Sequence, residues 1–290
     1  MFDGFATDRI DTGEAEIFVR HGGTGPPVVL LHGHPRTHAT WHRVAPMLAP
    51  ELTVVCPDLR GYGRSSKPPT TPDHAPYSKR AMARDVVAVM RSLGHQRFAV
   101  VGHDRGSLVA MRLAMDHPEA ATKLVEADGI PIAEHLDRAD ARFALEWWHW
   151  FFFAQPDRPE RAILEDPDAW YDGSPDTMGV EAYDEWRSAI HDPETVKAML
   201  EDYRAGVGID REHDEADRAA GRRITCPVLV LWSTEDDMQR LYGDVPAIWR
   251  AWADDVHGGA IHSGHHMAEE APEELARVLR AFLLDRQEQP

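Results

Sequence analysis

The chain has 290 residues, of which 43% are hydrophobic, and its formal net charge is -18. This size and composition suit one large domain or one domain with an inserted cap, and no apolar run is long enough to span a bilayer. The negative charge excludes nucleic acid as a partner, because phosphate binding needs a cationic surface. The amino terminus lacks the basic start and apolar block of a secretory signal, so we expect a cytoplasmic protein.

Short apolar runs bounded by turn residues predict buried strands, and they alternate with segments of helical periodicity. Such alternation is typical of a mostly parallel sheet flanked by helices. From residue 133 to 220 the pattern is helical and rich in tryptophan and charge. We therefore predict an α/β core, residues 1–132 and 221–290, with an inserted helical cap, residues 133–220. The predicted strands cover 28–31, 52–56, 98–102, 123–128 and 227–232, and the clearest core helices cover 78–93 and 107–116.

The strongest chemical signal is Gly102-His103-Asp104-Arg105-Gly106, between a predicted strand and a predicted helix. Its spacing is that of the nucleophile elbow G-x-S-x-G, with aspartate in the serine position. The glycines are needed because the turn is very tight, and the following helix directs its first amides at the central side chain. The pattern predicts that the carboxylate of Asp104 is a nucleophile that forms a covalent ester.

Hydrolysis of an aspartyl ester requires a base that activates water. The segment 261–267, IHSGHHM, follows the last strand in the chain order nucleophile, acid, histidine. The small pair before His265 favours this residue as the base, and His262 and His266 are the alternatives.

A histidine base needs a carboxylate that fixes its tautomer. Asp128 ends the predicted strand 123–128, whereas Asp236 and Asp237 follow the strand that ends at Trp232. The later position is usual in serine hydrolases, and both positions stay open on the fold alone.

Two further turns carry a family resemblance: HGHP at 32–35 and DLRGYGRS at 58–65. Together with the elbow they resemble the α/β-hydrolase superfamily, in the branch shared by epoxide hydrolases and dehalogenases. The resemblance implies an α/β-hydrolase fold, with an oxyanion hole formed by the backbone amides of His34 and Arg105. Such donors stabilise a developing oxyanion by a few kcal/mol, on the order of 3.

Over nearly its whole length, cap included, the chain resembles the haloacetate (fluoroacetate) dehalogenases. The segments WWHWFFFAQP at 147–156 and EDYRA at 201–205 look like that family's halide pocket. The resemblance implies that His149, Trp150 and Tyr203 donate hydrogen bonds to the departing halide, while the other aromatic residues pack the cap.

The same resemblance points to Asp128 as the acid that orients the histidine, and we favour it over Asp236 and Asp237. It also implies a homodimer and a reaction without cofactor or metal. The absence of CxxC and HExxH spacings agrees with the lack of a metal site.

Arg105 follows the nucleophile, and we expect its guanidinium to bind a substrate carboxylate. The family pattern is Asp-Arg-Gly-x-Arg, but this chain has Leu108 where the second arginine belongs. One guanidinium binds a carboxylate less well than two, by about 2 kcal/mol. Either Arg36 or His38 supplies a replacement cation, or the substrate is bulkier or neutral and Leu108 lines an apolar pocket.

These residues predict a hydrolytic dehalogenase that acts on a small molecule, a short 2-halo carboxylic acid, through an aspartyl ester. An epoxide hydrolase with the same nucleophile and base is the alternative. It would need phenolic donors, for which Tyr203 and either Tyr171 or Tyr183 are candidates. A ligand receptor built on the same fold is a third possibility, against which the intact nucleophile, base and acid argue.

Overall fold

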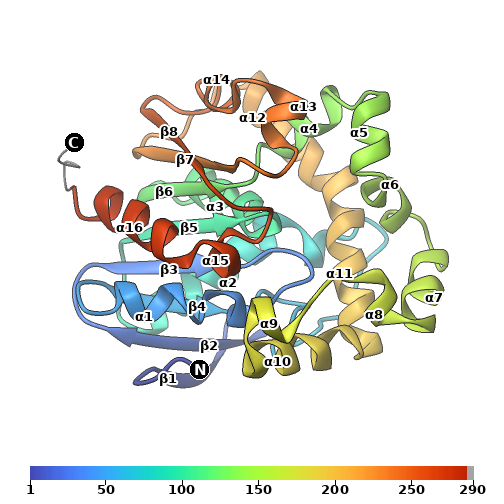
Figure 1. Cartoon of the computed structure of the whole chain (residues 1–290). Coiled ribbons are helices and arrows are strands. Elements are labelled where there is room, and N and C mark those ends of the chain that lie inside the picture. The colour runs from blue at the N-terminus through green and yellow to red at the C-terminus, as the bar shows by residue number, and fades with distance from the viewer. Residues whose placement is uncertain (286–290) are drawn as a thin grey trace.

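The computed structural model describes residues 1–285 and has a mixed sheet at its centre (Figure 1). Residues 286–290, which end the predicted second core segment, lie outside the described residues. The strands are β1 Ala6–Asp11, β2 Glu16–Gly23, β3 Pro27–Leu31, β4 Thr53–Pro57, β5 Phe98–His103, β6 Ala121–Ala127, β7 Val228–Ser233 and β8 Val256–Ile261. Their order in the sheet is β1-β2-β4-β3-β5-β6-β7-β8. The β1–β2 and β2–β4 pairs are antiparallel and the others are parallel, which confirms the predicted fold class.

The central strands bury both of their faces, because successive side chains point to opposite sides of the sheet. Val28 and Leu30 pack in a cluster with α1 (Val44–Leu48) and α16 (Pro272–Leu283), whereas Val29 and Leu31 pack in a second cluster with α2 (Lys79–Ser92) and α3 (Arg105–Asp116). Burial of each such side chain stabilises the fold by about 1.5–3 kcal/mol. The helices of the core are η1 His38–Trp41, α1 Val44–Leu48, η2 Ala75–Tyr77, α2 Lys79–Ser92, α3 Arg105–Asp116, α13 Met238–Tyr242, α14 Val245–Trp249, α15 Met267–Glu270 and α16 Pro272–Leu283.

A run of helices lies between β6 and β7, and we call residues 132–219 the cap. Figure 1 shows the cap on one side of the molecule, with α11 running along the edge of the core. The boundaries predicted from the sequence, 133 and 220, stay a prediction. The cap helices are α4 Ile132–Asp137, α5 Ala141–Glu146, α6 His149–Phe153, α7 Arg158–Glu165, α8 Pro167–Trp170, α9 Pro175–Met178, α10 Val180–Ile190, α11 Pro193–Ala205, the π-helix η3 Gly206–Asp210 and α12 Arg211–Ala219.

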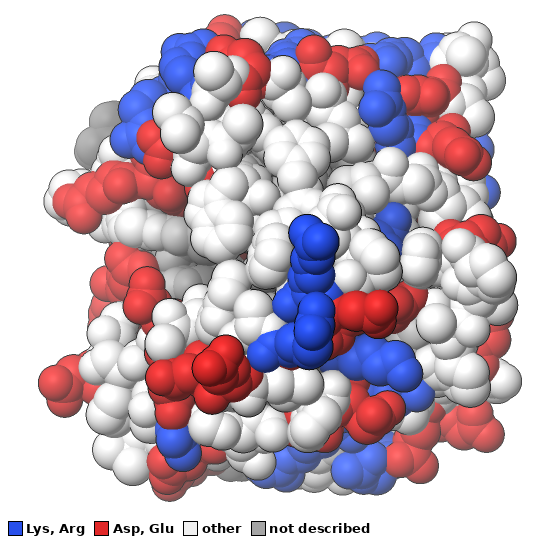
Figure 2. Space-filling view, turned by 90° about the vertical axis from the view of Figure 1, so that its right-hand side faces the viewer, with Lys and Arg blue, Asp and Glu red and all other residues white. Residues whose placement is uncertain are grey.

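The outward face of the cap carries charges of both signs around uncharged residues (Figure 2). Leu145, Trp148 and Phe151, from the α5–α6 segment, are exposed large apolar side chains on the cap. Helix α6 therefore has aromatic residues on its solvent side as well as on the side that faces the core. No helix within residues 1–285 is long and apolar enough to cross a membrane.

The parallel strands bring distant parts of the sequence to one edge of the sheet. Asp104 follows β5, Asp128 follows β6, Asp236 follows β7 and His265 follows β8. Because carboxyl ends of parallel strands lie at the same edge, residues that are far apart in the chain meet beneath the cap. This edge is where ligands bind in open α/β sheets.

Candidate active site

Asp104 occupies a sharp bend between β5 and α3. Its backbone φ of 52° and ψ of -120° lie in a region that side-chain-bearing residues rarely adopt. Glycines on both sides make the bend possible. A Cβ on Gly102 would lie 2.3 Å from the carbonyl oxygen of Gly106, and one on Gly106 would lie 2.5 Å from the carbonyl oxygen of Leu31. The elbow predicted from the sequence is therefore built as a strained turn that only glycine can flank.

Two backbone amides bind the carboxylate of Asp104. The amide of His34 donates to Oδ1 at 2.6 Å, and the amide of Arg105 also donates to this carboxylate. A Cβ on Gly33 would stand 2.3 Å from Oδ1, so a glycine is needed for this close approach. Burial disfavours the charge, but His265, His103 and the Arg105 amide hold the pKa of Asp104 below its usual value. The carboxylate is therefore ionised and available as a nucleophile.

His265 faces Asp104 from the loop after β8. Its Nε2 lies 3.9 Å from Oδ2 of Asp104, and its carbonyl oxygen lies 2.7 Å from Nε2 of His103. The two alternative histidines have other surroundings: the side chain of His262 is 78% exposed and lies 3.7 Å from Glu235, while the ring of His266 packs against that of His265, with centroids 5.1 Å apart, and burial holds its pKa well below the usual value. The structure brings His265 to the nucleophile.

The carboxylate that binds His265 is Asp236, which differs from our preference for Asp128. Nδ1 of His265 lies 2.7 Å from Oδ2 of Asp236 and 3.9 Å from Oδ2 of Asp128. Asp128 is instead bound by Ser233, whose amide and hydroxyl donate to it at 2.8 and 2.5 Å. Asp237, the other alternative, accepts a hydrogen bond from the indole of Trp147. The physical reason is that Ser233, at the end of β7, occupies the hydrogen-bonding positions of Asp128. The imidazole of His265 therefore pairs with Asp236, in the loop that follows β7.

The two carboxylates also differ in charge. Burial raises the pKa of Asp128 to about 7, even though His265 and Ser233 favour its ionised form. Burial acts on Asp236 as well, but the hydrogen bond from His265 outweighs it and lowers the pKa. Burial opposes the cation on His265, yet the bond to Asp236 and the charges of Asp104 and Asp128 raise its pKa to about 10. Near neutral pH the free site thus holds an imidazolium against ionised Asp104 and Asp236.

The predicted halide donors lie together above Asp104. His149 and Trp150 line a cavity of about 220 Å³ with the nucleophile and the base. Tyr203 is buried, with its ring centroid 5.9 Å from that of His149 and 6.1 Å from that of Trp150. Burial and the charge of Asp104 raise the pKa of Tyr203 well above its usual value, so its hydroxyl stays a donor. The residues lining this cavity are Asp104, Glu146, Trp147, His149, Trp150, Asp236, Asp237 and His265.

A second cavity, of about 250 Å³, lies on the other side of His149. It is mainly aromatic, and the buried hydroxyl of Tyr171 has no hydrogen-bond partner within residues 1–285. The ring of His34 packs edge-on against both Tyr171 and Tyr203, with centroids 5.2 and 5.1 Å away. The lining residues are His34, Pro35, Arg36, Trp148, His149, Phe153, Trp170, Tyr171, Asp172 and His266.

Arg105 is fully buried and already paired. Its Nη2 donates to both the side chain and the carbonyl oxygen of Asp202 at 2.8 Å, and its Nε donates to the same carboxylate at 3.3 Å. The ammonium of Lys79 also binds Asp202. Of the three guanidinium nitrogens of Arg105, only Nη1 has no hydrogen-bond partner among the described residues. The sequence shows an acid, Asp202, directly before Tyr203. It does not show that this acid pairs with Arg105, because the two residues are 97 positions apart.

The other residues expected to contact substrate have structural partners. Arg36 binds Glu269 at 3.0 and 3.3 Å and the carbonyl oxygen of Asp172 at 3.1 Å, so the structure does not present it as a replacement cation. His38 is buried against Asp58 at 2.8 Å. Leu108 is 5% exposed and belongs to the core cluster that also holds Tyr203.

Two groups of side chains within residues 1–285 have the spacing of metal ligands. One is His103, Asp128 and His265, which is organised by the hydrogen bonds described above. In the other, His38 and Asp58 bind each other, and Glu185 pairs with the guanidinium of Arg64 at 2.8 Å. The side chains of both groups already have hydrogen-bond or ion-pair partners within the protein.

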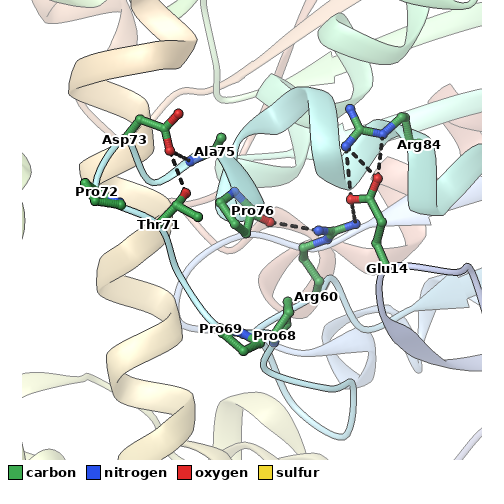
Figure 3. Close-up of a pocket in the computed structure, with 10 residues that line it drawn as sticks. All are labelled: Glu14, Arg60, Pro68, Pro69, Thr71, Pro72, Asp73, Ala75, Pro76 and Arg84. Atoms are coloured by element: carbon green, nitrogen blue, oxygen red, sulfur yellow. Dashed lines mark hydrogen bonds and ion pairs between the residues drawn. The ribbon is translucent and has the colours of Figure 1, made fainter.

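A larger hollow of about 750 Å³ lies away from the elbow (Figure 3). Proline side chains form much of its wall, and its buried Arg60 is held by Asp85, Glu14 and two backbone carbonyls. Arg84, at its rim, also binds Glu14. None of the ten residues drawn in Figure 3 belongs to the elbow or the histidine loop. The larger hollow therefore contains none of the residues predicted to act as nucleophile or base.

Comparison with known proteins decides the family. Residues 26–272 match the family described as the alpha/beta hydrolase fold. The chain is an α/β hydrolase. This hydrolase is 41% identical to a fluoroacetate dehalogenase from a Burkholderia species, over 98% of this chain and 96% of that protein. It is 33% identical to the soluble epoxide hydrolase of Corynebacterium sp. strain C12, over 87% of each. The crystal structure of ALR0039 from Nostoc sp. PCC 7120 superposes with a TM-score of 0.94 at 44% identity, covering 98% of this chain and 99% of that one.

Proposed function

We propose that this hydrolase is a dehalogenase that displaces halide from the α-carbon of short 2-halo acyl compounds, the class that includes the 2-halo carboxylic acids. The observation that carries the proposal is the ionised Asp104 carboxylate, held on two amides and facing His265 beside His149 and Trp150. The 41% identity to a fluoroacetate dehalogenase supports the same reaction class.

In the first step Oδ2 of Asp104 attacks the carbon that bears the halogen. The new carbon–oxygen bond forms as the carbon–halogen bond breaks, and the halide leaves with the electron pair. His149, Trp150 and Tyr203 donate hydrogen bonds to it in place of water. Oδ1 is held by the His34 amide and becomes the carbonyl oxygen of the ester.

In the second step His265, after releasing its own proton to solvent, takes a proton from a water molecule that attacks the carboxyl carbon of Asp104. The amides of His34 and Arg105 bind the oxyanion that forms on Oδ1. Collapse of the tetrahedral intermediate releases the hydroxy product and restores the carboxylate. Esterification neutralises Asp104, which removes one of the charges that raise the pKa of His265. The imidazole thus loses its proton more readily at the stage where a base is needed.

A trapping experiment tests the two roles separately. His265→Asn should form the ester but not hydrolyse it, so the intact protein should gain the mass of the substrate without its halide. Asp104→Asn should gain no mass and release no halide. In wild-type enzyme turned over once in ¹⁸O-labelled water, the label should enter Asp104 first.

His262→Asn is the matched control, because this exposed histidine lies three residues from the base and outside the site. It should turn over chloroacetyl and bromoacetyl substrates at the wild-type rate without a lasting adduct. Halide release by Asp104→Asn at the wild-type rate would refute the covalent mechanism.

Epoxide hydrolysis is the second candidate, and one observation favours it. Tyr171 and Tyr203 flank His34, and the hydroxyl of Tyr171 is buried without a partner among the described residues. Two phenols could donate to an epoxide oxygen while Asp104 opens the ring. Diol formation from styrene oxide that is lost in Tyr171→Phe, with halide release retained, would assign this second activity to the pair.

A further inference from the structure

We propose that the preferred substrate is a neutral α-halo carbonyl compound, such as an α-halo amide. It carries an uncharged group at the position where a 2-halo acid carries its carboxylate. This inference rests on the proposed function and specifies the substrate class of the same cavity.

The cavity at Asp104 is lined by acids without a lysine or arginine among its lining residues. Asp104, Glu146, Asp236 and Asp237 contribute four carboxyl groups. Burial and the adjacent Asp236 raise the pKa of Asp237 to about 6, so it is mostly ionised at neutral pH. Two cations oppose them: the imidazolium of His265, and the guanidinium of Arg240, which pairs with Glu146 at 3.1 Å on the exposed side of the cavity. A carboxylate that enters this cavity loses its hydration and meets like charges, whereas a neutral substrate avoids both penalties.

His149 does not add a positive charge. Burial lowers its pKa to about 4, although the charge of Asp104 favours the cation. His34 behaves in the same way, since burial lowers its pKa to about 3. Near neutral pH both rings are neutral and can bind a polar or apolar substrate group without attracting an anion.

The charge of Arg105 is compensated within the protein. Arg105 pairs with Asp202 at 2.8 Å, and Asp210 lies 3.7 Å from Lys79, whose pKa is lowered well below its usual value by burial and by the charge of Arg105. The two carboxylates therefore compensate the guanidinium without a contribution from Lys79. All four side chains are at least 98% buried. A substrate near Arg105 therefore meets a polar donor rather than an uncompensated cation.

The remaining donor capacity fits one oxygen rather than two. Nη1 of Arg105 is the guanidinium nitrogen that has no partner within the described part of the chain. Residues 105 and 108 lie on the same face of α3, and position 108 holds an apolar side chain. One free nitrogen can donate to one carbonyl oxygen, and neither Arg105 nor Leu108 is among the residues that line the cavity, so the pair offers no bidentate contact to a carboxylate.

Paired substrates test the inference directly. Chloroacetamide and chloroacetate have the same carbon–halogen bond and nearly the same size, and they differ in charge. We expect kcat/KM for halide release from the amide to exceed that from the acid by about tenfold or more, after subtraction of the rate with Asp104→Asn.

The possible outcomes separate this inference from the proposed function. An equal or higher kcat/KM for chloroacetate overturns the inference and leaves the dehalogenase assignment intact. Release of halide from neither substrate, nor from their bromo analogues, overturns the proposed function and this inference with it.

Two substitutions at Leu108 test whether charge at this position sets the preference between the amide and the acid. Leu108→Arg adds the second guanidinium and should shift the kcat/KM ratio toward chloroacetate by about tenfold or more. Leu108→Met alters the shape without adding charge and should keep the preference for the amide.

Because a buried arginine can disturb folding, Glu146→Gln provides a second route. Glu146 is exposed on α5, where it pairs with Arg240, and its replacement should lower KM for chloroacetate relative to KM for chloroacetamide. Glu165→Gln changes the net charge equally on an exposed end of α7 and should change neither value. If Glu165→Gln lowers KM for chloroacetate as much as Glu146→Gln does, the charge effect is not local and the inference is overturned.

Discussion

Asp104 combines a backbone of positive φ with a partly buried charge. Such a conformation costs about 1–3 kcal/mol and persists only where the surroundings fix it. Here the surroundings are the flanking glycines, the His34 amide and the imidazole of His265. The sequence predicted this residue because the elbow spacing stands between a buried strand and a helix and is accompanied by the turns at 32–35 and 58–65.

The partners of His265 and Arg105 were less accessible to sequence reasoning. Whether Asp128 or Asp236 binds His265 depends on the conformation of two loops, one after β6 and one after β7, that both reach the same imidazole. The pairing of Arg105 with Asp202 joins the core to the cap across 97 positions. Local spacing identifies chemically capable side chains, but tertiary packing decides which hydrogen bonds they form.

Removal of the hydrogen-bonded acid should disable the base. We expect Asp236→Asn to lower kcat by about 10²–10⁴-fold, because an amide no longer stabilises the imidazolium or fixes its tautomer. Asp128→Asn should cost about tenfold or less, since Ser233 already satisfies that side chain. Steady-state halide release from both variants measures the difference, and a larger loss in Asp128→Asn would assign the role to Asp128.

The same substitution should change the pH dependence of stability. The folded-state pKa of His265, about 10, lies above the ordinary value of 6.5. Its charge therefore stabilises the folded state fully below pH 6.5, and this contribution is lost as the pH rises toward 10. In Asp236→Asn the pKa of His265 should fall, as seen by NMR titration, and the decline of stability with pH should move to lower pH.

At the scale of single elements, the turn from β5 to α3 is the least adaptable part of the sheet edge. Gly106→Ala should reduce the free energy of unfolding by about 3 kcal/mol, because its Cβ would stand 2.5 Å from backbone oxygens of the β3 loop. Gly259→Ala in β8 is the matched control, since its Cβ would meet only Leu231, at 3.7 Å. Urea denaturation measures both, and equal stabilities of the two variants would contradict the steric argument.

The predicted strands correspond to β3 through β7, which are continuous apolar runs buried by packing on both faces. The sequence did not predict β1, β2 or β8. β1 is largely exposed at the edge of the sheet, and β8 contains Gly258 and Gly259. These strands form because a neighbouring strand offers hydrogen bonds, which hydrophobic periodicity does not reveal.

At the scale of the whole molecule, the net charge of -18 should influence which substrates arrive at the site. For chloroacetate, kcat/KM should rise with added salt, because screening weakens the repulsion between an anion and a negative protein. For chloroacetamide it should stay nearly constant. Initial rates from about 20 to 500 mM sodium sulfate, a salt without halide, compare the two. A fall for chloroacetate would indicate that local cations dominate its binding.

The two carboxylates beside His265 have a consequence for how such a site can change over generations. They come from loops after different strands, yet both lie within 4 Å of the same ring nitrogen. In this chain Ser233 occupies Asp128, so a lineage that moves the supporting role to Asp128 has to change position 233 before it loses Asp236. The histidine thus fixes the reaction, and the residue at position 233 decides which neighbouring loop supplies its acid.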